Sequence, residues 1–214
     1  MKTVIFILLG LLLGVNHGAA GEVIVIDHFD NGLRPEWEEK TFKGRTNYSV
    51  VEENGNGVLK AESRDAASGL IFRINIDVKE YPILTWRWKV ENILEKGDAT
   101  RKEGDDYAAR VYVVFPHWVP FKSRSINYIW ANRLPQGEYV PSPFFRNSIM
   151  VAVRSGYAGV GRWQMERRNL LEDYRRIFGG DPPEASAVAI MTDTDNTGGS
   201  AKAFYDEIRL EKTP

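Results

Sequence analysis

Short stretches of alternating apolar and polar residues recur along almost the whole chain. Such alternation is typical of β-strands, because successive side chains of a strand point to opposite faces of its sheet. The segment Asn54-Gly55-Asn56-Gly57 separates two of these stretches and predicts a tight hairpin, since Asn and Gly tolerate positive φ. The alternation predicts strands over residues 22–29, 48–51, 58–63, 70–78, 83–90, 107–115, 126–131, 148–154 and 162–167.

The last part of the chain, residues 187–210, predicts two further strands joined by an acidic, glycine-rich turn. With these, about eleven strands are predicted, at the spacing of a two-sheet antiparallel β-sandwich. We therefore predict an all-β fold of the jelly-roll or galactose-binding-like kind. No linker rich in Pro, Gly or Ser and no internal repeat divides the chain, so we predict a single domain over residues 21–214.

One short helix is predicted to flank the sandwich. Asn169 and Glu172 match a capping box at its start, and Gly179 ends it. Four apolar residues fall on one face of this helix: Leu170, Tyr174, Ile177 and Phe178.

Residues 1–20 have the three parts of a secretory signal peptide: Lys2, an apolar run over residues 4–13, and small residues up to Ala20. The run is shorter than the roughly 20 apolar residues that a membrane-spanning helix needs, and no later segment comes closer. We expect a periplasmic or secreted protein without a transmembrane segment after cleavage. The chain has no Cys, which excludes disulfides, a lipid-modified Cys and thiolate metal sites.

The charge and composition narrow the classes of ligand. A formal net charge of −1 argues against the positive field that nucleic acids require, so no nucleic acid partner is expected. The chain contains 6 Trp, 9 Tyr and 10 Phe, which serve equally well as core residues and as platforms that stack on sugar rings. We expect a monomer.

Strand alternation turns a group of charged side chains away from the expected core. If their strands are neighbours, Arg87, Arg110 and Arg154 share a surface with nearby carboxylates, and an acidic sugar or another anionic small molecule would bind there. The alternative is a lattice in which Arg and Asp side chains neutralise one another. The candidate ligand-binding residues are Arg87, Asp105, Asp106, Arg110, Tyr112, Trp130, Arg154, Asp193, Asp195 and Asn196.

Acidic residues near the two ends of the domain suggest a structural calcium ion. The loop that begins at Asp193 starts like an EF-hand loop, but Phe204 stands where an EF-hand needs a bidentate Glu, which excludes that motif. The ends of a jelly roll pair with each other, so Asp27, Asp30 and Asp206 are candidate Ca²⁺ ligands. A solvated turn is the alternative for each of them, and no other cofactor is expected.

Signatures of catalysis are mostly missing. His28 and His117 are isolated, and the chain contains neither a His-Glu-x-x-His motif nor a Gly-x-Ser-x-Gly motif. Glycoside hydrolysis needs only two carboxylates, which this sequence neither supports nor excludes. A lyase is also conceivable, in which Arg110 neutralises a sugar carboxylate while Tyr112 acts as the base.

Two aromatic loops are further candidates for binding. Residues 132–146 form a long predicted loop that carries Tyr139, Phe144 and Phe145, and loops of this length are often functional. Residues 116–121 carry Trp118 and Phe121, which would stack on a sugar, touch a membrane surface or pack on the core. The sequence does not choose among these roles.

Six short motifs together resemble a family of exported bacterial proteins catalogued as domain of unknown function 3047. The resemblance covers essentially the whole of residues 21–214 and implies a single exported domain with a sandwich fold, without an assigned activity. More loosely, Phe29-Asp30 and residues 204–208 are similar to the two ends of jelly-roll carbohydrate-binding modules. The six motifs are Trp86-Arg87-Trp88, Gly104-Asp105-Asp106 with Ala109-Arg110, Tyr128 with Trp130-Ala131, residues 152–156, Arg167-Arg168-Asn169 with Asp173 and Phe178-Gly179, and Met191-Thr192-Asp193 with Asp195-Asn196.

These observations favour an exported, non-catalytic domain that recognises a polysaccharide or another cell-envelope ligand. One alternative is a polysaccharide lyase or glycoside hydrolase that acts on an acidic glycan. A second alternative is a structural or assembly partner in the envelope.

Overall fold

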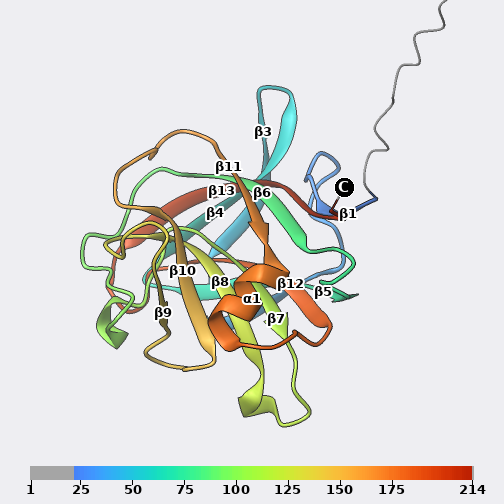
Figure 1. Ribbon diagram of the computed structural model, residues 1–214. Coiled ribbons are helices and arrows are strands. Elements are labelled where there is room, and N and C mark those ends of the chain that lie inside the picture. The colour runs from blue at the N-terminus through green and yellow to red at the C-terminus, as the bar shows by residue number, and fades with distance from the viewer. Residues whose placement is uncertain (1–21, 214) are drawn as a thin grey trace, which may run out of the picture.

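The computed structural model describes residues 22–213, which form two β-sheets stacked face to face with a short helix at one side (Figure 1). The all-β sandwich predicted from the alternation is therefore confirmed. The predicted signal peptide, residues 1–20, lies outside the described residues. Within the described part of the chain, no helix is both long enough and apolar enough to cross a bilayer.

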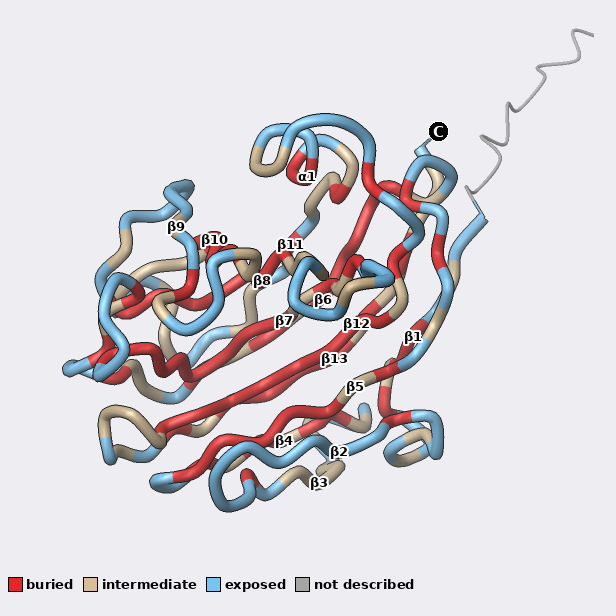
Figure 2. Tube along the Cα trace, turned by 90° about the horizontal axis from the view of Figure 1, so that it is seen from below, coloured by how far each residue is buried: buried red, intermediate tan, exposed pale blue. Residues whose placement is uncertain are grey.

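The first sheet has six strands, and β13 lies in its middle. In Figure 2 this strand is buried along most of its length, because both of its edges are paired and its inner face meets the other sheet. In spatial order the strands are β11 (Gln164–Asn169), β6 (Ile83–Val90), β13 (Ser200–Glu211), β4 (Asn56–Arg64) and β3 (Asn47–Glu53), and β1 (Val23–Asp27) also pairs with β13.

The second sheet has seven strands, and its outer face carries the site described below. At one edge of this sheet the strand β2 is exposed along nearly its whole length (Figure 2). In spatial order the strands are β2 (Trp37–Lys43), β5 (Ala67–Ile76), β12 (Ala185–Asp193), β7 (Arg110–Phe115), β8 (Arg124–Ala131), β10 (Ser148–Ser155) and β9 (Tyr139–Pro141).

One strand pair departs from the antiparallel pattern. Strands β8 and β10 run parallel, with Ile149 opposite Ile126, whereas the other strand pairs of the described residues are antiparallel. Parallel neighbours cannot be joined by a tight turn, because the chain must return to the same end of the sheet. Residues 132–147 make this return, and β9 lies within them.

Large aromatic side chains hold the two sheets together. Trp86 and Trp88 of β6 face Tyr128 and Trp130 of β8, with ring centroids 5.3 Å apart for Trp86 and Tyr128 and 5.9 Å apart for Trp88 and Trp130. All four are fully buried. Each aromatic pair adds about 0.5–1.5 kcal/mol to the free energy of area burial alone. Three of the four rings also donate hydrogen bonds to buried or half-buried acceptors. The acceptors are Glu166 for Trp88, the Gly156 carbonyl for Trp130 and Asp173 for Tyr128.

The predicted helix is present as α1 (Leu170–Phe178). The side chain of Asn169 accepts a hydrogen bond from the Glu172 N–H at 3.1 Å, and Gly179 follows the last turn, as the capping pattern predicts. The Tyr174 ring lies 4.7 Å from Phe115 at the end of β7, so the helix packs on the second sheet near the start of the β7–β8 hairpin.

Two strands escaped prediction, and both lie at edges of the second sheet. In β2 only Trp37 is buried, so the charged remainder of the strand shows no apolar alternation. Strand β9 has three residues, ends in Pro141 and lies inside the segment predicted as a loop. Edge strands pair on one side only, so less of their sequence is constrained to be apolar.

The predicted hairpin joins β3 to β4, and its glycines have different roles. Asn54 and Gly55 adopt positive φ values of 56° and 84°, as the turn requires. Gly57 instead allows a close approach, because a Cβ atom there would lie 2.3 Å from the backbone oxygen of Phe29. The side chain of Asp30 accepts a hydrogen bond from the Gly57 N–H at 2.9 Å, which fixes the segment after β1 against this hairpin.

We predict that Gly57→Ala lowers the free energy of unfolding by about 1–3 kcal/mol, because the added methyl group meets backbone and not a movable side chain. Urea denaturation followed by tryptophan fluorescence measures the change. The neighbouring substitution Asn56→Ala is the control, and it should stay within about 0.5 kcal/mol because Asn56 is exposed. Equal stability of the two variants would contradict the close approach.

Candidate functional site

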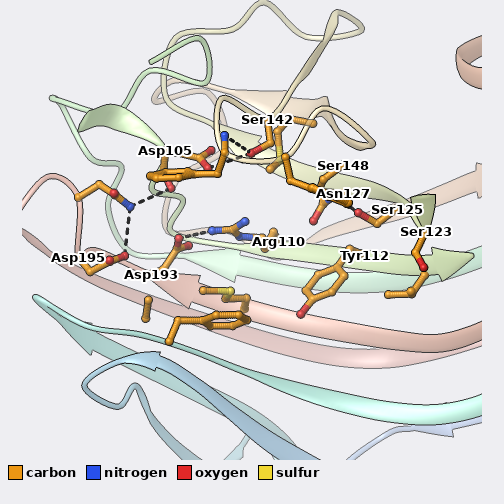
Figure 3. Close-up of a pocket in the computed structure, with 18 of the residues that line it drawn as sticks. Asp105, Arg110, Tyr112, Ser123, Ser125, Asn127, Ser142, Ser148, Asp193 and Asp195 are labelled. Carbon is orange, nitrogen blue, oxygen red and sulfur yellow. Dashed lines mark hydrogen bonds and ion pairs between the residues drawn. The ribbon is translucent and has the colours of Figure 1, made fainter. Parts of the chain in front are cut away.

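The outer face of the second sheet is hollowed into an open groove of about 510 Å³ (Figure 3). The alternation of β7 determines which side chains line it. Val111 and Val113 point into the core, so Arg110 and Tyr112 point outward into the groove. The loops that follow β9 and β12 rise at its sides and contribute Ser142 and other lining residues.

The floor of the groove is a cluster of small polar side chains on β8 and β10. The amide nitrogen of Asn127 donates to Ser148 Oγ at 2.8 Å and to Ser125 Oγ at 3.1 Å, and the Ser125 hydroxyl donates to Ser148 Oγ at 2.8 Å. Figure 3 shows these side chains together beside Tyr112. Within the described residues the Tyr112 hydroxyl has no hydrogen-bond partner, so it is available to a ligand.

Exposed phenylalanine rings border this polar floor. Phe144 and Phe145 come from the loop between β9 and β10 and are 57% and 41% exposed, and Phe42 comes from β2. The Lys102 ammonium lies 5.4 Å from the centre of the Phe144 ring, which restricts the orientation of that ring. Apolar rings above hydroxyl and amide groups suit a ligand that has both flat apolar faces and many hydroxyl groups.

One end of the groove holds a buried ionic network. Arg110 forms an ion pair with Asp193, and its guanidinium lies 4.9 Å from the centre of the Tyr107 ring. The Tyr107 hydroxyl donates to Asp105 at 2.8 Å, and the Ser142 hydroxyl donates to the other oxygen of Asp105 at 3.3 Å. Because the Arg110 charge already has a partner, this end does not offer a free cation to an anionic ligand.

Burial changes the acidity of the groups in this network. It raises the pKa of the Asp193 carboxyl to about 7, with Arg110 opposing the change and neighbouring carboxylates adding to it. Burial also raises the pKa of Asp105 and brings that of Tyr112 to about 12. At neutral pH Tyr112 is therefore a protonated hydrogen-bond donor, which argues against its predicted role as the base of a lyase.

Asp106 binds the turn after β12 instead of facing the groove. Its carboxylate accepts hydrogen bonds from the backbone N–H of Thr197 at 2.6 Å and of Asn196 at 3.1 Å, and from the Asn196 side chain at 3.0 Å. Asp105 and Asp106 are adjacent in the chain but point in different directions, and only Asp105 lines the groove. The turn places Asp195 and Asn196 at the rim of the groove.

The structure places the ten candidate ligand-binding residues in three environments. Six of them line the groove, Asp106 supports it, and three lie elsewhere. The six that line the groove are Asp105, Arg110, Tyr112, Asp193, Asp195 and Asn196.

The expectation of a common arginine surface is wrong. Arg87 belongs to β6 of the first sheet, where it pairs with Asp206, so the two sheets separate it from Arg110. Arg154 lies in the second sheet but turns to Glu166 of β11. The pairing of Arg with acidic neighbours, which was the alternative to an anion site, describes all three arginines.

Trp130 is buried in the core and does not reach the groove. It alternates in phase with Ile126 and Tyr128, so β8 turns all three inward, and its indole N–H donates to the Gly156 carbonyl at 3.0 Å. The expected contact between Trp130 and a ligand is therefore wrong.

The three carboxylates expected to share a calcium ion do not meet. Asp27 accepts hydrogen bonds from Trp37 and Phe29, Asp30 accepts one from Gly57, and Asp206 pairs with Arg87. Within residues 22–213 only one set of three acidic residues has oxygens within 4.8 Å of one another, namely Asp106, Asp193 and Asp195. Each of these three carboxylates already has a protein partner: Asp106 accepts from the Thr197 N–H, Asp193 pairs with Arg110, and Asp195 accepts from the Asn196 side chain.

Sequence reasoning missed most of the groove floor and one of its rings. Ser125 and Asn127 precede and follow the buried Ile126, so their outward positions were predictable, but small polar residues on an outer face carry no signal of function. Phe42 lies in β2, the strand that was not predicted. The lining residues that sequence reasoning did not propose include Phe42, Ser125, Asn127, Ser142, Ser148, Met150 and Met191, whereas Phe144 and Phe145 belong to the aromatic loop that was proposed as a candidate.

Comparison with known proteins identifies a family and a fold. The model of one protein family, described as protein of unknown function (DUF3047), matches residues 35–209. The family 30 carbohydrate-binding module of a Clostridium thermocellum cellulosomal cellulase has a similar structure, with a TM-score of 0.50 and 12% identity, over 88% of this chain and 98% of that module. A family 28 module specific for non-crystalline cellulose gives a TM-score of 0.46 and 18% identity, over 91% and 97% of the two chains. No curated protein sequence matches the chain significantly.

The raised pKa of Asp193 predicts a pH dependence of stability. The folded chain holds this proton up to about pH 7, whereas the ordinary pKa of the group is 3.8. The contribution of Asp193 is therefore largest below about pH 4 and is lost as the pH rises towards about 7.

Chemical denaturation of the wild type and of Asp193→Asn across this pH range tests the prediction. Asn keeps the size of the side chain and does not titrate, so the free energy of unfolding of the wild type should fall relative to that of the variant as the pH rises. Parallel curves for the two proteins would contradict the raised pKa.

Proposed function

We propose that this chain, which belongs to the DUF3047 family of proteins of unknown function, is an exported, non-catalytic domain that binds an uncharged polysaccharide in the groove of its second sheet. The observation that carries the proposal is the composition of the groove: phenylalanine rings stand beside a floor of hydroxyl and amide groups. A sugar ring has an apolar face that stacks on an aromatic ring and hydroxyl groups that bond to such a floor.

The fold supports the same function. The family 30 module, which has a similar structure, is by its description a carbohydrate-binding module of a cellulase. Fold alone does not determine function, so the argument rests on the lining of the groove in this chain. The signal peptide predicted from the sequence of residues 1–20 supports the proposal of export.

The electrostatics of the groove favour an uncharged ligand over an acidic one. Three carboxyl groups line it, those of Asp105, Asp193 and Asp195, and the guanidinium of Arg110 is already paired with one of them. A ligand carboxylate would have to displace Asp193 from Arg110 or approach Asp105 and Asp195, whose charges no Arg or Lys of the described residues pairs with directly, and both cost free energy. The hydroxyl groups of an uncharged sugar do not have to displace Asp193 from Arg110, and the carboxylates of the groove do not repel them.

We predict that Phe144→Ala weakens binding of a neutral glucan oligosaccharide about tenfold, which corresponds to about 1.4 kcal/mol. Isothermal titration of this oligosaccharide, with an oligouronate of equal length for comparison, measures both affinity and preference. Phe121→Ala is the matched control, because it also removes an exposed ring but lies outside the groove. Absence of heat with neutral glycans, or equal losses in the two variants, would contradict the proposed site.

A second candidate function, hydrolysis of a glycosidic bond, is favoured by one observation. Asp105 and Asp193 both line the groove and both have a raised pKa, which is the property of a general acid that works near neutral pH. Their existing partners, Tyr107, Ser142 and Arg110, point instead to a structural role.

Incubation with a polymeric β-glucan and assay of new reducing ends separates the two functions. The binding proposal predicts no release above background by the wild type, and the same background with Asp105→Asn. Release by the wild type that Asp105→Asn abolishes would establish the enzyme instead.

A further inference from the structure

The tip of the β7–β8 hairpin exposes two large rings that the groove does not use. Trp118 is 88% exposed and Phe121 is 68% exposed, and neither lines the groove. In Figure 1 this hairpin extends past the end of both sheets, beyond β7 and β8. Exposure of two large rings on one projecting loop costs solvation free energy and is typical of a contact surface.

The tip has a defined shape that holds these rings outward. Nδ1 of the His117 ring accepts a hydrogen bond from the Val119 N–H at 2.9 Å, and the backbone N–H of His117 donates to Ser123 Oγ at 3.1 Å. Residues 120–122 form a turn of 3-10 helix that begins at Pro120. A rigid tip loses little conformational entropy when it binds.

A second loop lies against the tip and adds to the same surface. The side chain of Asn147 donates to the Phe121 carbonyl at 3.1 Å and so ties the loop between β9 and β10 to the hairpin. The residue before it, Arg146, is exposed. The surface formed by Trp118, Phe121, Lys122 and Arg146 is called the aromatic tip below.

The aromatic tip lies in a basic stretch of the chain. Between Tyr107 and Met165 the sequence contains 1 carboxylate residue, Glu138, against 7 arginines and lysines, although the whole chain has a net charge of −1. Among the ion pairs of the described residues, none involves Lys122 or Arg146. Both cations are free to meet an anionic partner.

We propose that the aromatic tip inserts into the interfacial layer of an anionic lipid bilayer. Trp and Phe prefer the boundary between headgroups and acyl chains, and Lys and Arg beside them bind lipid phosphates. The tip is a projection that fits a deformable surface. A glycan would instead suit a concave platform with a cluster of hydroxyl and amide groups, which is what the groove supplies. This proposal does not depend on what the groove binds.

Fluorescence of the full chain with lipid vesicles tests the proposal, because Trp118 reports its own position. Among the six tryptophans, Trp37, Trp86, Trp88 and Trp130 are buried and Trp163 is half-buried, so Trp118 is the one open to lipid. Residues 1–20 contain no tryptophan, so they add no tryptophan fluorescence of their own. The vesicles contain phosphatidylcholine and phosphatidylglycerol in equal parts, with brominated acyl chains as quenchers.

The expected result is a blue shift and bromine quenching that Trp118→Phe abolishes. Lys122→Glu keeps the reporter Trp118 and should raise the lipid concentration for half-maximal quenching about tenfold. Vesicles of pure phosphatidylcholine should also raise this concentration for the wild type. Phe144→Ala, in the groove, should leave quenching unchanged. Quenching that persists in Trp118→Phe, or no quenching by anionic vesicles, would overturn the proposal, and the tip would then be a contact for a protein or glycan.

Discussion

The pleat of the second sheet, together with the aromatic core beneath it, determines which side chains of β7, β8 and β10 line the groove. Because Trp86 and Trp88 of one sheet stack against Tyr128 and Trp130 of the other, the inner faces of β6 and β8 have no freedom to exchange with the outer faces. A shift of one residue in β8 would bring Ser125 and Asn127 into the core and expose the aromatic residues. The polar floor of the groove is thus the reverse side of the core, and its position is as firmly determined as the packing of the tryptophans.

The same constraint explains which parts of the site the sequence predicts. Alternation within β7 predicted that Arg110 and Tyr112 point away from the core, and they do. The alternation also predicted that Arg87 in β6 and Arg154 in β10 lie on the opposite strand face from the apolar residues beside them. However, the alternation contains no information about which sheet a strand joins. That assignment depends on long-range pairing, and it separated Arg87 from Arg110 although both belong to regular amphipathic strands. Local pattern therefore predicts the face of a residue, and topology determines its neighbours.

The edges of the second sheet show a different limit. Strand β2 has one buried residue and β9 has three residues, so neither leaves a pattern that distinguishes it from a loop. These edges supply or position the phenylalanine rings of the groove: Phe42 lies on β2, and Phe144 and Phe145 follow β9. The fold class depends on the central strands and was predictable, whereas the lining depends on weakly constrained edges and was only partly predictable. The aromatic loop was recognised as a candidate because of its composition, without any indication of the surface it would cover.

The parallel pairing of β8 and β10 has a consequence for how such a domain diversifies. Since these two strands run parallel, the residues between them, 132–147, must travel back along the sheet, and such a return takes roughly a dozen residues or more. An insertion or deletion in this return leaves the hydrogen-bond ladder between the two strands intact, because the ladder is defined by the strands and not by the path between them. The part of this return that holds Phe144 and Phe145 lies after β9, so its length and sequence can change without altering the pairing of β9 with β10. Members of one family that share every strand would then differ in what their surfaces recognise.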